Sequence, residues 1–332
     1  MDAARLISQH DEKTAETFAA AADRYVNSRL AIGLKPGSIE DYRDRIRLHL
    51  LPAFGSSPLA QVEPEQIERW IAEQRHAGAS TTSIRHYLSL MSSIFRYEIR
   101  RGRCRRNPIS EADIPRPDQR VEIRYLTITE LETLLAAVPS DPLGLVERPI
   151  YATAAMTGLR RGELLALRWG DVDFPAGLLR VRRSYRKGRF DIPKTRSSAR
   201  AVPFGLRVRT ELEQHLARTS FGDVEDLVFG MPHSGGVYDP SYMTKRFRAA
   251  RRRAGLRPVR FHDLRHTFGT QMAAAGAPLR SIQAWLGHSD YKTTLIYADY
   301  VPDITGAAAF AARAFGEVAP PHGQSEANMI AA

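Results

Sequence analysis

Apolar side chains recur at helical spacing along residues 14–106, and breaks in the pattern divide this segment into four short helices. The first predicted helix ends at Gly33, the second runs from Ser38 to Pro52, and the third opens at Pro64 and closes near Gly78. The inward-facing side chains predicted on the four helices are Phe18, Ala22, Tyr25, Val26, Leu30, Tyr42, Ile46, Leu50, Ile67, Trp70, Ile71, Ile84, Tyr87, Leu88, Met91, Phe95 and Ile99. Together they predict a small helical bundle.

The apolar period is lost over residues 107–124, where prolines recur, and this predicts a linker between two domains. Beyond the linker, Thr127 and Glu130 have the spacing of a helix capping box. Strand-like runs cover Leu178 to Tyr185, the residues around Phe190 to Ile192, and Ala199 to Phe204. Helical spacing then returns. Residues 125–315 are therefore predicted to form a mainly α-helical domain with a small antiparallel β-sheet.

These patterns predict an α+β protein with a helical N-terminal domain over residues 14–106 and a second domain over residues 125–315. Residues 1–13 are predicted to be a disordered segment and residues 316–332 a flexible tail, because neither has an apolar period. No apolar run approaches the ~18 residues that a membrane span requires. We therefore expect a cytoplasmic protein.

Basic residues exceed acidic ones, with 48 Lys and Arg against 37 Asp and Glu and a formal net charge of +11. Such an excess favours a polyanionic partner, since neutralising the phosphates of a nucleic acid releases its condensed counterions. Arginines concentrate in the second predicted helix and after the fourth. The candidate DNA-binding residues are Arg43, Arg45, Arg47, Arg85, Arg101, Arg103, Arg105 and Arg106.

His262 and His266 lie one helical turn apart, the spacing that zinc proteases of the H-E-x-x-H type use. Asp263 is shorter than the glutamate that this chemistry needs, and Arg265 would place a fixed positive charge beside the metal. Cys104 is the single cysteine, which excludes a thiolate cluster. We predict no metal site, and interpret His262 and Arg265 as a phosphate-binding pair on one helix face.

Arg160 is predicted to begin a helix just after a chain reversal, because glycines stand at positions 158 and 162. A cation at a helix start gains nothing from the helix dipole. Sequences tend to break local rules of this kind at functional sites. Arg160 is therefore a candidate site residue.

Four separated motifs resemble those of the tyrosine recombinase (phage integrase) family: TGLRRGELLALRWGD at 157–171, HDLR at 262–265, LGH at 286–288, and Tyr297. His288 follows Arg265 by 23 residues and Tyr297 follows His288 by nine, as in the family pattern. The resemblance implies a SAM-like core DNA-binding domain in residues 14–106 and the family's catalytic domain in residues 125–315.

The resemblance also implies a role for each matching residue. Arg160 and Arg265 correspond to the two phosphate-binding arginines, and His262 and His288 to the two proton-handling positions. Tyr297 corresponds to the nucleophile. Tyr291 and Tyr300 are rivals that lie off the family spacing.

Two further positions follow from the same resemblance. Lys194, between two strand-like runs, corresponds to the lysine that protonates the leaving group, with Lys187 and Lys292 as alternatives. Glu163 corresponds to a supporting acidic position that orients neighbouring basic groups. One departure is Asp299, which stands where the family more often has a histidine that is not catalytic.

In such enzymes a tyrosine hydroxyl attacks a DNA phosphodiester, which forms a 3′-phosphotyrosyl link and releases a 5′-hydroxyl. The covalent bond conserves the energy of the phosphodiester, so the resemblance implies neither a cofactor nor a metal. It predicts a site-specific recombinase that acts as a homotetramer on double-stranded attachment sites, in the host cytoplasm at the nucleoid. An excisionase or a host DNA-bending factor is a further candidate partner.

The resemblance leaves alternatives within the family open. Integration and excision of a phage or mobile element is the main prediction, and a Xer-like resolvase of chromosome or plasmid dimers would use the same chemistry. A catalytically silent DNA-binding regulator is disfavoured, because every catalytic motif position is filled. A type IB topoisomerase has similar chemistry, but the motif spacing fits recombinases better.

Overall fold

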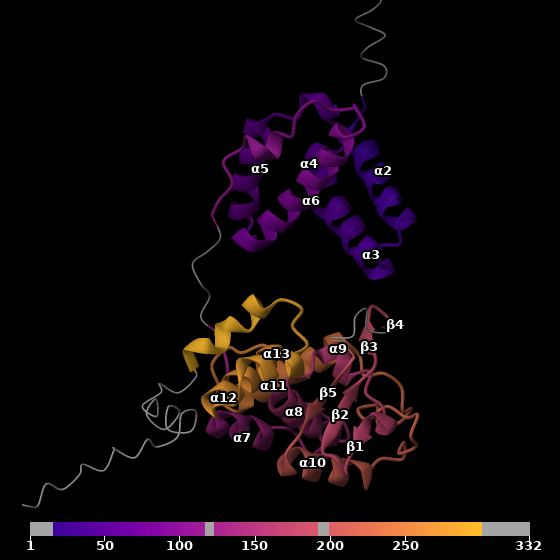
Figure 1. Cartoon of the computed structure of the whole chain (residues 1–332), viewed down its shortest axis with the longest axis vertical. Coiled ribbons are helices and arrows are strands. Elements are labelled where there is room, and N and C mark those ends of the chain that lie inside the picture. The colour runs from indigo at the N-terminus through magenta and orange to yellow at the C-terminus, as the bar shows by residue number, and fades with distance from the viewer. Residues whose placement is uncertain (1–15, 117–122, 192–198, 301–332) are drawn as a thin grey trace, which may run out of the picture. The chain divides into compact units, whose positions relative to one another are not determined.

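A computed structural model describes residues 16–116, 123–191 and 199–300. The chain divides into two compact units, Met1–Glu122 and Ile123–Ala332 (Figure 1). The predicted N-terminal disordered segment, the flexible tail and Lys194 lie outside the described residues. Among the residues that are described, no helix is long and apolar enough to cross a membrane.

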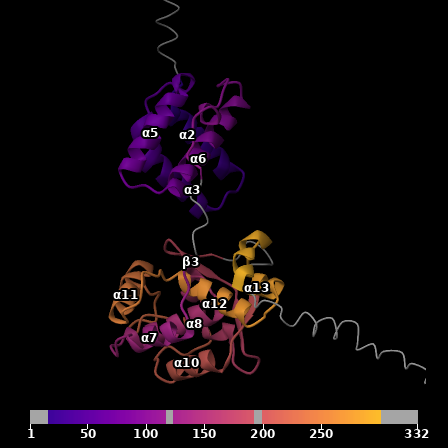
Figure 2. The same ribbon diagram turned by 90° about the vertical axis from the view of Figure 1, so that its left-hand side faces the viewer.

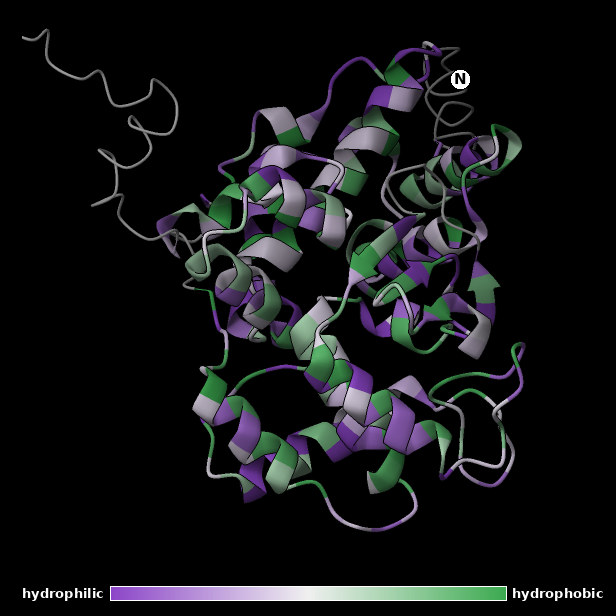
Figure 3. Cartoon of the chain, turned by 60° about the horizontal axis from the view of Figure 1, so that its bottom comes forward, coloured by the Kyte–Doolittle hydropathy of each residue, from purple (hydrophilic) through white to green (hydrophobic). Residues whose placement is uncertain are grey.

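The N-terminal unit is helical throughout its described part. Its elements are α2 (Phe18–Ala31), α3 (Pro36–Arg45), the π-helix η1 (Ile46–Leu50), α4 (Leu51–Phe54), the 3₁₀ turn η2 (Leu59–Gln61), α5 (Pro64–His76), α6 (Thr81–Ile99) and the 3₁₀ turn η3 (Pro108–Ser110). The side-chain oxygens of Thr17 and Ser80 cap the starts of α2 and α6. Phe18, Phe54 and Phe95 meet in the core, and hydrophobic and hydrophilic residues alternate around the helices (Figure 3).

The second predicted helix differs from the structure at both ends. It begins at Pro36 rather than Ser38, and it continues past Pro52 to Phe54. Pro52 is tolerated because η1 widens the helix ahead of it, so that it lies in the first turn of α4, where its missing N–H needs no partner. In α2, Leu30 was predicted to face inward, but it is 49% exposed because the last turn of this helix extends past the core.

The start of the predicted linker belongs to the N-terminal core. Pro108 and Ile109 of η3 are buried, and Ala112 and Ile114 pack against the same core. The sequence pattern missed this packing because the turn contributes only isolated apolar residues and has no helical period.

The C-terminal unit consists of helices and two small sheets. Its elements are α7 (Ile128–Ala136), α8 (Gly144–Thr157), α9 (Arg161–Leu164), η4 (Trp169–Asp171), β1 (Val172–Asp173), β2 (Leu178–Val181), β3 (Ser184–Arg186), β4 (Arg189–Asp191), β5 (Arg200–Pro203), α10 (Leu206–Leu216), α11 (Pro240–Arg253), α12 (Asp263–Ala274), α13 (Leu279–Leu286), η5 (Tyr291–Thr293) and η6 (Leu295–Tyr300). The capping box of Thr127 and Glu130 is present at the start of α7, as predicted.

The strands form two antiparallel sheets, where one was predicted. One sheet has the order β1-β2-β5, with Leu179 opposite Val202, and the other is the β3–β4 hairpin. The predicted strand over 178–185 is split between them, because Arg183 turns away to bind the buried carboxylate of Asp171 at 2.8 Å. Both sheets lie to one side of the helices (Figure 1).

Helix α8 lies at the centre of this unit, between α10 and α12 (Figure 2). Its buried residues surround the helix, as expected of an element covered on all sides. Gly158 ends α8 in the left-handed conformation, with φ at +66°. A Cβ at this position would also lie 2.6 Å from the side chains of Phe268 and Leu286. Only glycine adopts this conformation readily and also leaves room for both side chains. The chain reversal at Gly158 sets the position of Arg160, two residues later.

Candidate active site

Arg160 stands at the N-cap of α9, where the sequence analysis found a cation in an unfavourable place. Glu163, one turn later, compensates for it. The Glu163 carboxylate accepts the backbone N–H of Arg160 at 2.8 Å and its Nη1 at 2.9 Å. The other end of the Arg160 guanidinium, Nη2, donates to the carbonyl of Gly287 at 3.1 Å. The guanidinium is therefore fixed from two sides.

Arg265 lies in the first turn of α12 and is almost fully buried. Its Nη1 donates to the carbonyl of Gly158 at 2.6 Å, and its Nη2 donates to the carbonyl of Leu286. Burial and the nearby charge of Arg160 lower the pKa of Arg265 to about 9, which leaves it cationic at neutral pH.

Both arginines thus bind the carbonyl end of α13. Helix ends leave such carbonyls without helical partners, and the helix dipole makes this end negative, so it attracts cations. Gly287 ends α13 in the left-handed conformation, with φ at +64°, and His288 follows directly. The structure therefore brings together three residues that the sequence predicted as site residues, Arg160, Arg265 and His288.

Three histidines surround this pair of arginines. His262 precedes α12, and its ring lies edge to face with that of His266 at a centroid distance of 5.4 Å. The Nδ1 atom of His288 lies 3.0 Å from the Thr294 hydroxyl. Burial, reinforced by neighbouring positive charge, lowers the pKa of His262 to about 4 and that of His288 to about 3, and burial also lowers that of His266. All three are neutral at pH 7.

Tyr297, on η6, is completely buried. Its hydroxyl lies 3.0 Å from Nδ1 of His266, and its ring packs so closely on Gly269 of α12 that any Cβ there would overlap it. Burial raises the pKa of Tyr297 to about 12, against the opposing influence of Arg265. The phenol is therefore protonated and held by a neutral imidazole.

Sequence reasoning missed two residues of this cluster. The sequence analysis considered His266 only as half of a metal pair, which it rejected, and gave this histidine no other role, whereas His266 contacts the Tyr297 hydroxyl. Among the described residues, no group of three metal-ligating side chains could hold an ion. Arg200 of β5 was not singled out, yet both Nη atoms contact Glu163, at 2.9 and 2.8 Å. Burial would raise the pKa of Glu163, but the hydrogen bonds and charges of Arg200 and Arg160 outweigh it and lower the pKa to about 2.

A cleft of about 840 Å³ opens beside Arg160 and His262. Arg161, Arg248 and the turn of the β3–β4 hairpin with Lys187 also line it, so its walls are strongly basic. Lys187 was an alternative to Lys194, and the hairpin places it in this cleft. Lys292, the other alternative, lies on η5.

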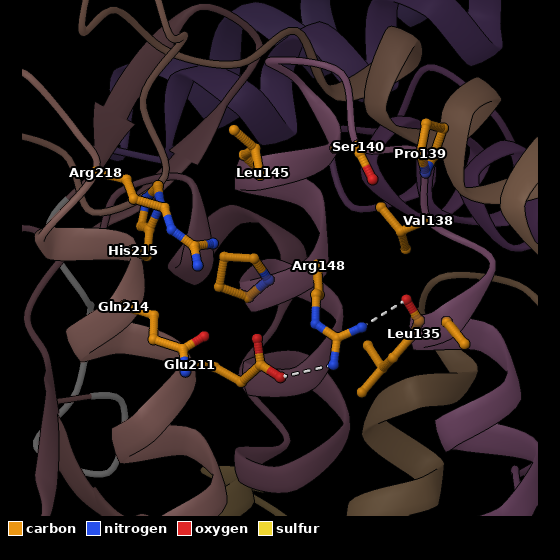
Figure 4. A pocket seen from close by; sticks show the side chains of 13 residues that line it. Leu135, Val138, Pro139, Ser140, Leu145, Arg148, Glu211, Gln214, His215 and Arg218 are labelled. Carbon is orange, nitrogen blue, oxygen red and sulfur yellow. Dashed lines mark hydrogen bonds and ion pairs between the residues drawn. The ribbon is translucent and has the colours of Figure 1, made fainter.

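A second cavity, of about 180 Å³, lies between α10 and the segment joining α7 to α8 (Figure 4). It contains none of the candidate catalytic residues. Its Arg148 is already engaged, with the Leu135 carbonyl at 2.9 Å and the Glu211 carboxylate at 3.2 Å. We therefore place the candidate active site at the cleft beside Arg160.

The candidate DNA-binding arginines of the N-terminal unit fall into two groups. Three contact acidic side chains: Arg103 binds Glu98, Arg106 binds Glu63 and Glu111, and Arg47 lies 3.6 Å from Asp44. Arg85 donates to the Pro115 carbonyl, and Arg101 lies over the Tyr97 ring at 3.8 Å. The second group is Arg43, Arg45 and Arg105: within the described part of the chain, no hydrogen bond or ion pair engages their side chains.

The lowered histidine pKa values predict how stability depends on pH. An unfolded histidine has a pKa of about 6.5, so below that pH the unfolded chain binds protons that the folded site rejects. The free energy of unfolding should therefore fall as the pH drops from about 6.5 to about 5, above the range in which carboxylates titrate. Urea unfolding across this window measures it. His288→Asn should show a shallower fall than the wild type, and a slope identical to the wild type would contradict the assignment.

Comparison with known proteins places this geometry in context. Residues 124–302 match the phage integrase family, and residues 18–113 match the phage integrase central domain. The chain is 30% identical over 278 residues to tyrosine recombinase XerD of Listeria innocua, covering 80% of this chain and 88% of the relative. It is 27% identical over 299 residues to a XerC-like tyrosine recombinase of Caldanaerobacter subterraneus subsp. tengcongensis, covering 81% and 75%.

Two solved structures are similar in fold. The Tn1549 transposon integrase in complex with a circular intermediate DNA aligns with a TM-score of 0.72 at 21% identity, covering 89% of this chain and 98% of that one. A lambda integrase dimer bound to a COC′ core site aligns with a TM-score of 0.68 at 20% identity, covering 87% and 96%. These likenesses confirm the predicted fold class.

Proposed function

Because the chain belongs to the phage integrase family of tyrosine recombinases, we propose that this site-specific DNA recombinase cleaves DNA with the Tyr297 hydroxyl. The observation that carries the proposal is the convergence of Arg160 and Arg265 on the end of α13. His288 follows that helix end directly, and the Tyr297 hydroxyl contacts His266, which is next to Arg265 in α12. These groups come from α9, α12, η6 and the end of α13, and of them Arg160 lines the basic cleft.

Arg160 and Arg265 bind the nonbridging oxygens of the scissile phosphate in this proposal. A five-coordinate phosphorus gathers negative charge on those oxygens, so fixed guanidinium donors stabilise the transition state more than the ground state. Their carbonyl and carboxylate contacts hold both side chains in place before DNA arrives. Glu163 orients Arg160 and takes no part in bond making.

The chemistry forms one bond and breaks one. The Tyr297 oxygen bonds to phosphorus while the bond from phosphorus to the 5′-oxygen breaks, which leaves a 3′-phosphotyrosyl link. The phenolic proton passes to a neutral imidazole, and we assign Lys194 as the acid that protonates the departing 5′-oxygen. His262 and His288 are neutral at pH 7 and so can accept or donate hydrogen bonds around the phosphate. A 5′-hydroxyl of a partner strand then reverses the step, and no metal or cofactor takes part.

Tyr297 is fully buried in the structure, so η6 has to move before its hydroxyl can reach a phosphate. The contacts that hold the segment include the buried cluster of Tyr297 with Phe268 and Leu286, the His266 hydrogen bond, the packing on Gly269, and the contact between His288 and Thr294. DNA entering beside His288 is placed to disturb the last of these.

A nicked suicide substrate tests the linkage. A nick just downstream of the scissile phosphate lets the short released strand diffuse away, so a covalent adduct accumulates. A label 5′ of the break should remain with the protein, because the 3′-phosphate is attached, and a label on the released fragment should not. Retention of the opposite label would overturn the proposed polarity.

For the assembly, we propose a homotetramer on two double-stranded DNA attachment sites, in the cytoplasm at the nucleoid. Support comes from a related fold, the lambda integrase tetramer bound to a Holliday junction, which aligns at 20% identity with a TM-score of 0.66. The segment 303–315, which lies outside the described residues, is proposed to dock on a neighbouring subunit. An excisionase or a host DNA-bending factor remains a proposed partner.

We favour integration and excision of a phage or mobile element as the biological role, since the similar solved structures include transposon and lambda integrases. The curated relatives XerD and XerC support a second candidate, resolution of chromosome or plasmid dimers. Recombination between the sites that flank the gene in its host would support the first role, and recombination between sites near the replication terminus would support the second.

The arginine pairings predict which residues supply DNA contacts. Arg105→Ala should weaken binding and lower the slope of log K against log salt by about 0.9, the value for one phosphate contact. Arg103→Ala is the matched control, since Arg103 is occupied by the buried Glu98 at 2.5 Å. It should leave the slope unchanged and lower the unfolding midpoint. Fluorescence anisotropy at several salt concentrations measures both slopes, and equal losses would contradict the assignment.

A further inference from the structure

Arg200 is the first residue of β5, and its side chain is only 6% exposed. Each of its three guanidinium nitrogens donates to a protein oxygen. Nη1 and Nη2 bind the two oxygens of Glu163 at 2.9 and 2.8 Å, and Nε binds the carbonyl of Trp285 at 2.5 Å. Arg200 is therefore a buried side chain that is held at all three guanidinium nitrogens.

These contacts connect the two partners of the Arg160 side chain, Glu163 and the end of α13. Glu163 binds one end of the Arg160 guanidinium, and the carbonyl of Gly287 binds the other. Arg200 binds the Glu163 carboxylate and also the carbonyl of Trp285. Trp285 lies in the last turn of α13, which leads to Gly287. A Cβ at Gly287 would lie 3.1 Å from Nη1 of Arg200, so the two pack closely.

We propose that Arg200 is a positioning residue of the recombinase: it holds Glu163 against the end of α13 and so orients the Arg160 guanidinium. The proposal rests on the proposed function of Arg160 in binding the scissile phosphate. Because Arg200 binds Glu163 and the carbonyl of Trp285, its loss acts through Arg160 and the end of α13.

The test compares cleavage of the nicked suicide substrate by Arg200→Met, Arg200→Lys and the wild type, in single turnover with protein at saturation. Replacing residues that orient a site from behind commonly lowers activity about 10- to 100-fold. We expect Arg200→Met to lower the cleavage rate constant by that factor while the Kd for DNA changes less than about twofold, since the effect concerns the transition state. Arg200→Lys keeps the charge but loses the two-nitrogen contact with Glu163, so its cleavage rate should lie between those of Arg200→Met and the wild type.

The chain offers a matched structural control in Arg246. This arginine is 19% exposed and also binds a buried glutamate twice, Glu147 at 2.8 and 3.0 Å, near the opposite end of α8. Arg246→Met should lower the unfolding midpoint while the cleavage rate of the folded protein stays at the wild-type value. A merely structural role for Arg200 predicts this same behaviour for Arg200→Met, which would overturn the proposal.

A pH profile of the cleavage rate, corrected at each pH for the folded fraction, separates this role from a loss of stability. The charged and titratable groups nearest Glu163 are Arg160, Arg200 and Arg265, with His288 beside these arginines. Arg200 is the largest influence that lowers the pKa of Glu163, so without it burial raises this pKa. Protonation of Glu163 removes the ion pair that orients Arg160, and cleavage by Arg200→Met should therefore fall more steeply than that by the wild type as the pH drops below about 7. Adding Glu163→Gln should abolish this extra fall, because no carboxylate remains to titrate.

The outcomes separate the two proposals. If the wild type forms no adduct, the proposed function fails and the role of Arg200 fails with it. If the wild type forms an adduct and Arg200→Met cleaves equally fast with the same pH profile, only the role of Arg200 is contradicted.

Discussion

Tyr297→Phe is expected to abolish the covalent adduct with DNA. The substitution removes the one oxygen that could bond to phosphorus, and loss of a catalytic nucleophile lowers rates by a factor on the order of 10⁴ or more. Stability should change little, because the hydroxyl makes one hydrogen bond, to His266 at 3.0 Å, and such a bond contributes about 1 kcal/mol. Denaturing gel electrophoresis of the suicide-substrate reaction measures the adduct.

Two neighbouring tyrosines provide matched controls for this experiment. Tyr291 packs under Arg280 at 4.6 Å, and the Tyr300 ring lies 5.2 Å from that of Tyr125. Tyr291→Phe and Tyr300→Phe remove a hydroxyl from the same segment and should still form the adduct. DNA binding by all three variants should match the wild type. Adduct formation by Tyr297→Phe, or its loss in only one of the controls, would assign the nucleophile elsewhere.

Arg265→Gln is expected to cause the second-largest loss. Its guanidinium spans the carbonyls of Gly158 and Leu286, and removing one preorganised donor at a transition-state oxyanion costs about 10²- to 10³-fold in rate. A full positive charge is lost as well, so we expect at least that reduction in single-turnover cleavage. Arg265→Lys should restore little, because an ammonium cannot bridge both carbonyls and still face the phosphate.

The control for Arg265 is an exposed arginine far from the site. Arg218 is exposed and lines the second cavity (Figure 4), whose lining includes none of the candidate residues. Arg218→Gln should cleave at the wild-type rate. Because Arg265 is buried, unfolding midpoints and DNA affinity need to be measured alongside the rate. A loss of rate that follows only the loss of folded protein would contradict a role in catalysis.

Local sequence signals predicted much of the fold. Helical periods gave four N-terminal helices, and the capping box of Thr127 and Glu130 marked the start of α7. The same signals failed where an element depends on distant partners. Pro52 indicated a helix end because nothing in the local sequence announces the π-turn before it. The run over 178–185 read as one strand because the binding of Arg183 to Asp171 is a tertiary contact.

The site shows the same division. Arg160 was noticeable because a cation at a helix start breaks a local rule, and its compensating partner Glu163 lies only one turn away. Arg200 carried no such signal, since its partners Glu163 and Trp285 lie 37 and 85 residues away. The helical spacing of His262 and His266 was correctly noted, but only the placement of η6 against α12 revealed that His266 contacts Tyr297.

Identifying the tyrosine that carries the DNA tests the central claim most directly. The wild-type adduct from the suicide substrate can be digested with a protease and a nuclease, and the remaining nucleotide located by tandem mass spectrometry. Tyr291, Tyr297 and Tyr300 fall close together in the sequence, so fragment ions between them are needed to tell them apart. The account predicts a 3′-linked nucleotide on Tyr297 alone, and a nucleotide on Tyr291, Tyr300 or any residue of the N-terminal unit would contradict it.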